Sequence, residues 1–231
     1  DPHPIVLDTD PGVDDALAII YALNHPDLQV HAITTVCGNI GIDQATRNAQ
    51  IILSLLDYTV PLAIGQNQPI YYPLQTALHV HGPDGLGNVS VQFESLEGQV
   101  VKESAVEQIL DSVAKFPDQL RLVCIGPLTN IAQAILANSP LMRRTKEIIL
   151  MGGVFERRGN VTTSAEFNIY VDPHAAQIVL EAGVPITILP LDVTHQVILS
   201  ADCLRQATQC SNAPWRNFTW SITQPCMRFH Q

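Results

Sequence analysis

Residues 4–15 have the sequence PIVLDTDPGVDD, in which a run of apolar residues leads directly into a cluster of carboxylates. The apolar run has the composition of a buried strand, and Val13–Asn24 has the spacing of a helix. Between them, Pro11 and Gly12 are residue types that turn the chain. A strand, a short turn and a helix make the first half of a βαβ unit, so this segment predicts a parallel sheet.

The same alternation continues along most of the chain. Further strands are expected at residues 30–36, 61–64, 120–125, 148–151 and 185–191, and further helices at 42–56, 101–116, 128–137 and 173–182. This pattern predicts an α/β fold with a mostly parallel, Rossmann-like sheet and helices on both faces. No segment has the composition of a linker, so we expect a single domain over residues 1–231.

Two segments depart from the alternation. Residues 71–97 are rich in Gly, Pro, His, Asn and Gln, which predicts a long loop, and long loops in compact domains are often functional. Residues 201–231 show weak periodicity, although residues 218–229 have the pattern of a helix.

The composition excludes several classes of protein. With 46% hydrophobic and 15% charged residues among 231, the chain is not intrinsically disordered. Asp and Glu outnumber Lys and Arg by 22 to 12, and the net charge of −10 argues against nucleic acid as a partner. No apolar run approaches about 18 residues, so no membrane association is expected. Five cysteines without a CxxC pair are typical of a reducing compartment, which predicts a cytoplasmic protein.

The carboxylates of the opening segment carry the strongest chemical signal. Asp8, Asp10, Asp14 and Asp15 repel one another unless a cation lies among them, and hard oxygen ligands favour Ca²⁺ or Mg²⁺. They follow the carboxyl end of a strand, where open α/β sheets bind ligands. Helix capping explains one or two of these residues, not four. An EF-hand is excluded, because the sixth and twelfth positions counted from Asp8 are Val and Ile instead of Gly and Glu.

The sequence of residues 8–18, DTDPGVDDALA, resembles the N-terminal signature of the inosine–uridine-preferring nucleoside hydrolases. Further segments agree with that family, in the same order and along nearly the whole chain. They are Cys37-Gly38-Asn39, His81-Gly82, Gly85-Leu86-Gly87, Gly126-Pro127-Leu128-Thr129-Asn130, Met151-Gly152-Gly153, Ala165-Glu166-Phe167-Asn168-Ile169, Val171-Asp172-Pro173 and Leu191-Asp192-Val193-Thr194-His195.

The resemblance implies a Ca²⁺-dependent enzyme that hydrolyses the N-glycosidic bond of purine or pyrimidine ribonucleosides to free base and ribose. It implies Asp10, Asp15 and the backbone carbonyl of Ile125 as metal ligands, with Asp10 as the base that activates a water. Asp10, Asp14 and Asn39 form the implied catalytic set. The implied partners are a small-molecule ribonucleoside and further copies of the chain, in a homodimer or homotetramer. The residues implied to bind substrate are Asp14, Asn39, His81, Met151, Asn160, Glu166, Phe167 and Asn168.

These residue types suit that chemistry. Breaking an N-glycosidic bond builds positive charge on the ribose, which a ring of carboxylates stabilises. A bound metal lowers the pKa of its water and orients it. Glu166 and Asn168 are two residues apart, so in an extended segment both side chains point to one face. Within the substrate set, His81 is implied to approach the base, and Met151 and Phe167 to line the sugar pocket.

Other interpretations stay open. Asn39 and Asn160 each follow a glycine and have the pattern of turn residues. Members of the family continue past the end of this chain with a His-Asp segment, so we expect the chain to be truncated at its C-terminus. A nucleoside- or ribose-binding relic without turnover is therefore one alternative function. A Mg²⁺ phosphohydrolase with Asp8 as nucleophile is another, because Asp8-x-Asp10 resembles the start of the haloacid dehalogenases.

Overall fold

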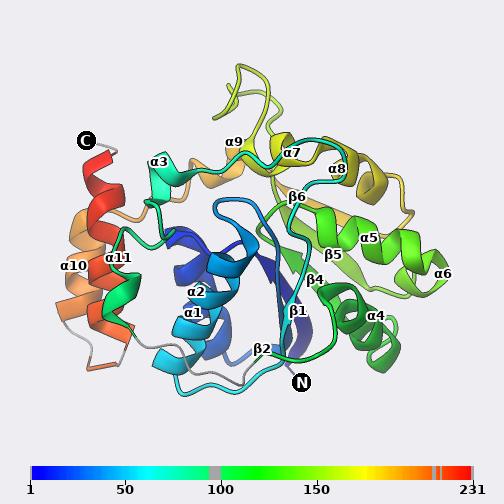
Figure 1. Cartoon of the computed structure of the whole chain (residues 1–231), viewed down its shortest axis with the longest axis horizontal. Coiled ribbons are helices and arrows are strands. Elements are labelled where there is room, and N and C mark those ends of the chain that lie inside the picture. The colour runs from blue at the N-terminus through cyan, green and yellow to red at the C-terminus, as the bar shows by residue number, and fades with distance from the viewer. Residues whose placement is uncertain (1, 94–99, 210–211, 214, 230–231) are drawn as a thin grey trace.

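The computed structural model describes residues 2–93, 100–209, 212–213 and 215–229, and a parallel sheet lies at its centre (Figure 1). In the described part the sheet has six strands in the order β3-β2-β1-β4-β5-β6, and each neighbouring pair is parallel. The prediction of a single α/β domain with a Rossmann-like sheet is confirmed. The strands are β1 (His3–Thr9), β2 (Leu28–Thr35), β3 (Leu62–Ile64), β4 (Arg121–Cys124), β5 (Glu147–Met151) and β6 (Ile186–Leu189).

Helices connect the strands and cover both faces of the sheet. Each crossover between neighbouring parallel strands takes the chain over one face, as a βαβ unit requires. The described helices are α1 (Val13–Asn24), α2 (Ile42–Leu55), α3 (Leu78–His81), α4 (Ala105–Lys115), α5 (Thr129–Ala137), α6 (Ser139–Met142), α7 (Phe167–Val171), α8 (Pro173–Leu180), α9 (Leu191–Thr194), α10 (Ala201–Gln209) and α11 (Trp215–Phe229), with a 3₁₀ turn η1 at Ser90–Gln92.

Alternate residues of the strands point to two separate cores. Ile5 and Leu7 of β1 pack with apolar residues of α1, α2 and α11 on one face of the sheet. Val6, between them, packs with residues of α4, α5 and α8 on the other face. Figure 1 shows these two groups of helices on opposite sides of the strands. The near-continuous apolar runs of the strands follow from this burial on both faces.

Most expected elements are present, and the differences have local causes. Helix α4 begins at Ala105 and not near residue 101, because the Ser104 hydroxyl accepts a hydrogen bond from the Glu107 backbone N–H and caps the helix there. Helix α10 was not predicted. In this helix only Leu204 and Thr208 are buried, which leaves little apolar periodicity to detect. The helix expected at residues 218–229 is confirmed and begins earlier, at Trp215.

The long loop expected at residues 71–97 is confirmed as far as residue 93, with only α3 and η1 as regular structure, and residues 94–99 lie outside the described part. Cys37 and Cys124 are buried in the core. Among the described helices, none has both the length and the apolar character that a membrane span requires.

The order of the strands determines where a site forms. From β1 the chain builds outward through β2 and β3, and then it returns to the other side of β1 with β4, β5 and β6. Open α/β sheets bind ligands at such a switch point, beyond the carboxyl ends of the strands. Here the switch point lies between β1, which leads into Asp10, and β4, which leads into Ile125.

Candidate functional site

Asp10 lies directly after β1, and its side chain is fully buried. Its Oδ2 accepts a hydrogen bond of 2.6 Å from the backbone N–H of Asn39, which belongs to the loop after β2. Its Oδ1 has no hydrogen-bond partner among the described residues. Because a buried carboxylate oxygen without a donor is costly, Oδ1 of Asp10 is the atom on which a bound cation or water is expected.

Two glycines leave the space that the Asp10 carboxylate occupies. A Cβ atom at Gly38 would lie 2.0 Å from Oδ2 of Asp10, and a Cβ atom at Gly126 would lie 2.6 Å from Oδ1. Gly38 follows β2 and Gly126 follows β4, so glycines from the two strands that flank β1 border the same side chain.

Asp15, in the first turn of α1, is buried and accepts hydrogen bonds at both oxygens. Oδ1 accepts from the Thr9 hydroxyl at 2.8 Å, and Oδ2 accepts from the backbone N–H of Gly12 at 3.1 Å. The Asn39 side-chain amide donates to Oδ2 of Asp15 at 3.1 Å and to the backbone carbonyl of Asp10 at 3.3 Å. Asn39 therefore holds both predicted carboxylate ligands.

Burial and mutual repulsion disfavour the charged forms of these acids. Burial raises the pKa of Asp10 well above its ordinary value, and the carboxylates of Asp15 and Asp14 raise it further. Burial raises the pKa of Asp15 to about 7, with a further contribution from Asp14. A cation bound between Asp10 and Asp15 would offset both effects, which is the electrostatic reason to expect one there.

Unlike the buried Asp10 and Asp15, Asp14 points outward. Its side chain is 82% exposed, and Oδ1 lies 3.8 Å from Nδ1 of His81. The backbone N–H of Val13 donates to the same His81 nitrogen at 3.2 Å, which assigns the proton of the neutral ring to Nε2. The structure thus brings His81 next to the first turn of α1.

Asp8 lies within β1, two residues before Asp10, and is fully buried. Its Oδ1 accepts hydrogen bonds from the Thr34 hydroxyl at 2.5 Å and from the Asn130 amide at 2.7 Å, while Oδ2 has no partner among the described residues. Burial raises its pKa to about 7. A carboxylate held this deeply is poorly placed to attack a phosphate ester, which disfavours the phosphohydrolase alternative.

Asn168 joins the ends of β4 and β5. Its side-chain amide donates to the backbone carbonyls of Ile125, at 3.0 Å, and Met151, at 3.1 Å. A carbonyl oxygen has two lone pairs, so the Ile125 carbonyl keeps one for a metal ion. Asn168, Met151 and Ile125 are thus brought together as a group at the carboxyl edge of the sheet.

Glu166 and Asn168 do not lie in an extended segment, so that expectation is wrong. Glu166 is the N-cap of α7, and its carboxylate accepts from the backbone N–H groups of Asn168 at 2.9 Å and Ile169 at 3.2 Å. It also accepts from the backbone N–H of Gly153 at 2.9 Å. An acidic side chain at this position satisfies the free N–H groups of a helix start, which turns the chain into α7. Burial raises the pKa of Glu166.

The last two predicted residues lie at the border of this region. Phe167 is half-buried at the start of α7. Asn160 is exposed in the loop between β5 and α7, and within the described residues no hydrogen bond joins it to the carboxylates. Asp192 of α9 anchors that loop by accepting from the backbone N–H groups of Phe155 and Glu156.

Three polar residues near the site carried no predicted role. Asn130 of α5 donates to Asp8 and to the backbone carbonyl of Thr35, and Asn48 of α2 donates to the backbone carbonyls of Pro11 and Asp84. The Asp84 carboxylate accepts from three backbone N–H groups of its own loop. The sequence offered only a weak indication of these roles. Asn130 belongs to the Gly126–Asn130 segment that agrees with the family, and Asn48 lies among the buried residues of α2.

The donor set fits a hard divalent cation. It combines the Asp10 carboxylate, whose Oδ1 lacks a donor, with the neighbouring Asp15 carboxylate and the Ile125 carbonyl, all oxygen ligands. In the described parts of the chain, no three His, Cys, Asp or Glu side chains are grouped so as to hold a metal on their own.

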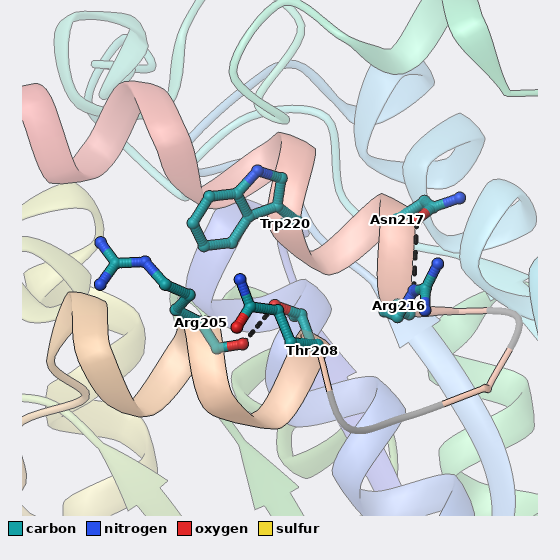
Figure 2. A pocket seen from close by; sticks show the side chains of 6 residues that line it. Arg205, Thr208, Arg216, Asn217 and Trp220 are labelled. Carbon is teal, nitrogen blue, oxygen red and sulfur yellow. Dashed lines mark hydrogen bonds between the residues drawn. The ribbon is translucent and has the colours of Figure 1, made fainter.

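Two cavities of the described part have linings that do not include Asp10. One, of about 440 Å³, has Glu166, Tyr72 and Tyr170 among its lining residues. The other, of about 380 Å³, lies between α10 and α11, where the side chains of Arg205 and Arg216 point away from each other (Figure 2). The arginines therefore do not converge on one ligand group.

Comparison with known proteins agrees with this geometry. The family described as "Inosine-uridine preferring nucleoside hydrolase" matches residues 5–231. The chain is 40% identical over 217 residues to the inosine-uridine preferring nucleoside hydrolase of Crithidia fasciculata, covering 93% of this chain and 68% of the relative. It is 43% identical over 202 residues to the non-specific ribonucleoside hydrolase RihC of Salmonella enteritidis, covering 87% and 65%.

A solved structure is similar in fold as well as in sequence. The plant nucleoside hydrolase PpNRh1 superimposes with a TM-score of 0.93 at 33% identity, over 100% of this chain and 72% of that one. The chain spans 64% of the length of an uncharacterized Schizosaccharomyces pombe protein to which it is 42% identical over 199 residues, or 85% of this chain. The chain belongs to the inosine-uridine preferring nucleoside hydrolase family.

Proposed function

We propose that this chain hydrolyses the N-glycosidic bond of purine and pyrimidine ribonucleosides in a Ca²⁺-dependent reaction that releases free base and ribose. The observation that carries the proposal is Oδ1 of Asp10, a buried carboxylate oxygen without a described donor, next to the buried carboxylate of Asp15. The relatives named as inosine-uridine preferring and non-specific ribonucleoside hydrolases support the same reaction.

Asp10, Asp15 and the Ile125 carbonyl would hold the Ca²⁺ ion. When bound, the ion supplies Lewis-acid chemistry, lowering the pKa of a water and placing it near the ribose. The rest of the reaction depends on the chain's own groups. Asp10 accepts the proton of the attacking water, because its Oδ1 is a carboxylate oxygen that has no hydrogen-bond partner among the described residues.

The same carboxylates stabilise the transition state. As the bond to the base breaks, its electron pair leaves with the base and positive charge develops on the ribose. The negative charges of Asp10, Asp14 and Asp15 stabilise that positive charge. Asp10 and Asp15 do so from buried, hydrogen-bonded positions, so little reorganisation of these two groups is needed during the reaction. The ribose gains the hydroxyl of the water and the base gains a proton, so each turnover consumes one water molecule.

The sugar would be held by side chains at the carboxyl edge of the sheet. Asp14 and Asn39 lie on the α1 side of the site, and Asn168 and Glu166 lie on the β5 side. Hydrogen bonds from both sides to the ribose hydroxyls would fix the orientation of the anomeric carbon, which lowers the entropic cost of the attack. Asn160 and Phe167 would complete the sugar pocket from the loop before α7 and from α7 itself.

The test is ribose release by the purified 231-residue chain from inosine and from uridine, with Ca²⁺ and after chelation. We expect chelator-sensitive release, with an Asp10→Asn variant as the inactive control. A second candidate is a nucleoside-binding protein without turnover, because within the described residues no three His, Cys, Asp or Glu side chains are grouped so as to hold a metal. Saturable inosine binding by a folded chain that releases no ribose would select that candidate and overturn the first.

A further inference from the structure

We propose that Asn48 is a positioning residue, which holds the segment His81–Ser90 against the turn that carries Asp10 and thereby places His81 for recognition of the nucleobase. This inference rests on the proposed function. We call the segment of residues 81–90 the His81 loop. Asn48 lies in the middle of α2 and belongs neither to the predicted metal ligands nor to the residues implied to contact substrate.

Asn48 is completely buried, and its side chain connects two segments that are distant in the sequence. Its Nδ2 donates to the backbone carbonyl of Pro11 at 2.9 Å and to the backbone carbonyl of Asp84 at 2.8 Å. Its Oδ1 accepts from the Gln44 side-chain amide at 2.8 Å. Both amide hydrogens meet carbonyls, so rotating the amide by half a turn would set its oxygen against two acceptors. The three bonds therefore define one orientation.

The backbone of the His81 loop is shaped to reach Asn48. Gly85 has a φ of +74°, and a Cβ atom there would lie 3.0 Å from Nδ2 of Asn48 and 2.8 Å from Cδ1 of Ile40. A side chain at residue 85 would be strained by the backbone conformation and would push the loop away from α2. The close approach of the loop to Asn48 thus depends on glycine at this position.

The His81 loop is internally tied, so that its parts move together. The Asp84 carboxylate accepts from the backbone N–H groups of Leu86, Asn88 and Ser90, at 2.8 to 2.9 Å. The backbone N–H of Gly87 donates to the carbonyl of His81 at 2.8 Å. A shift of Asp84 should therefore also shift His81, because these hydrogen bonds connect the two residues through the backbone of the loop.

Two hydrogen-bonded contacts then orient the His81 loop relative to the turn between β1 and α1. Asn48 bridges Asp84 to Pro11, and Nδ1 of His81 accepts from the backbone N–H of Val13. Because Pro11 and Val13 are two residues apart, the links fix both the distance and the angle of the loop relative to the turn. The His81 ring is thereby held close to Asp14.

Loss of Asn48 should disturb the loop more than the turn. Asp10 and Asp15 are held on their own side by Asn39, Thr9 and the backbone N–H of Gly12. The His81 loop has no comparable set of side-chain anchors to the turn within the described residues besides Asn48 and His81. The residues proposed to bind ribose should therefore stay in place while His81, which the family resemblance implies to approach the base, shifts.

The experiment measures the dissociation constants of inosine and of ribose by calorimetry, in buffer with Ca²⁺, with and without Asn48→Ala. Both chains also carry Asp10→Asn, so that inosine is not hydrolysed during the measurement. We expect Asn48→Ala to weaken inosine binding about five- to tenfold, the effect of one or two lost hydrogen bonds, and to leave ribose binding unchanged. Gly85→Ala, which disturbs the same contact from the loop side, should give the same selective loss, and it replaces Asn48→Ala if that variant fails to fold.

A matched control and a double-mutant cycle separate positioning from general destabilisation. Val113→Ala, in the buried core of the opposite face of the sheet, should lower the unfolding temperature without changing either dissociation constant. If Asn48 acts through His81, the effects of Asn48→Ala and His81→Ala on inosine binding should be non-additive. Additive effects, or equal losses for inosine and ribose, would overturn the inference while the proposed function stands. No inosine binding by the unmodified chain would overturn both.

Discussion

The backbone N–H of Asn39 donates a hydrogen bond of 2.6 Å to Oδ2 of Asp10, across 29 positions of sequence. This bond uses one carboxylate oxygen and leaves the other, Oδ1, without a described partner on the side where Gly126 provides space. The loop after β2 therefore determines which oxygen of Asp10 is available for chemistry. A backbone donor makes this arrangement independent of the rotamer of the Asn39 side chain.

Asp10→Asn should abolish turnover and leave the fold intact. The amide is nearly the same size, and its oxygen can still accept from Asn39, but an NH₂ group then replaces the oxygen that takes the proton. We expect ribose release to fall at least about a hundredfold, the range lost with a general base. Far-ultraviolet circular dichroism should be unchanged. Near-normal turnover of this variant would show that Asp10 is not the base.

Gly126→Ala should inactivate the chain by displacing the Asp10 carboxylate, because the new Cβ would lie 2.6 Å from Oδ1. A displacement of about 1 Å at a reacting group costs about a hundredfold in rate. Gly41→Ala is the matched control, since a Cβ there meets nothing within 4 Å. Ribose release, measured for both variants, should fall only for Gly126→Ala. Equal activities would contradict the inference that Gly126 leaves the space that the Asp10 carboxylate needs.

Calcium should stabilise the folded chain, because the proposed site of Asp10, Asp15 and the Ile125 carbonyl exists only in the fold. At a concentration about a hundred times its dissociation constant, the ion should add about 2.7 kcal/mol to the free energy of unfolding. For a chain of this size, that corresponds to a rise of roughly 5–10 °C in the unfolding temperature. Differential scanning fluorimetry with Ca²⁺ and after chelation measures this shift. An equal shift in Asp10→Asn would place the ion elsewhere.

Acid should loosen the His81 loop through Asp84. Partial burial acts to raise the pKa of Asp84, but the backbone N–H groups of Ser90, Leu86 and Asn88 outweigh it, and the pKa lies below the ordinary 3.8. The unfolded chain therefore takes up this proton first, so the stabilisation is complete above about pH 4 and is lost as the pH falls through the folded-state pKa.

The matching variant is Asp84→Asn, which keeps the shape of the side chain and removes its charge. At pH 7 we expect it to lower the unfolding temperature by about 2–4 °C, the shift that roughly 1 kcal/mol produces in a chain of this length. The difference from the unmodified chain should shrink as both are taken from pH 6 to pH 3. A difference that stays constant over this range would show that the charge of Asp84 does not hold the loop.

Local periodicity was sufficient to predict most of the sheet and its helices. The helix expected at Val13–Asn24 has those bounds in the structure, because a turn of Pro and Gly precedes it and its apolar spacing is regular. Helix α10 escaped prediction because its one buried face holds little apolar surface. The extended segment expected at Glu166–Asn168 was wrong because a side-chain cap, which has no periodic signal, starts α7 there.

The sequence by itself determined that Asp10 and Asp15 meet at the carboxyl end of the first strand, since only a turn separates the strand from α1. The tertiary structure alone decided which hydrogen bonds the amide side chains near this turn make. Asn39, Asn48, Asn130 and Asn168 reach this region from four different parts of the chain, and their contacts exist only because β2 and β4 flank β1. Hydrogen bonds between segments so far apart depend on the order of the strands, which periodicity along the chain does not encode.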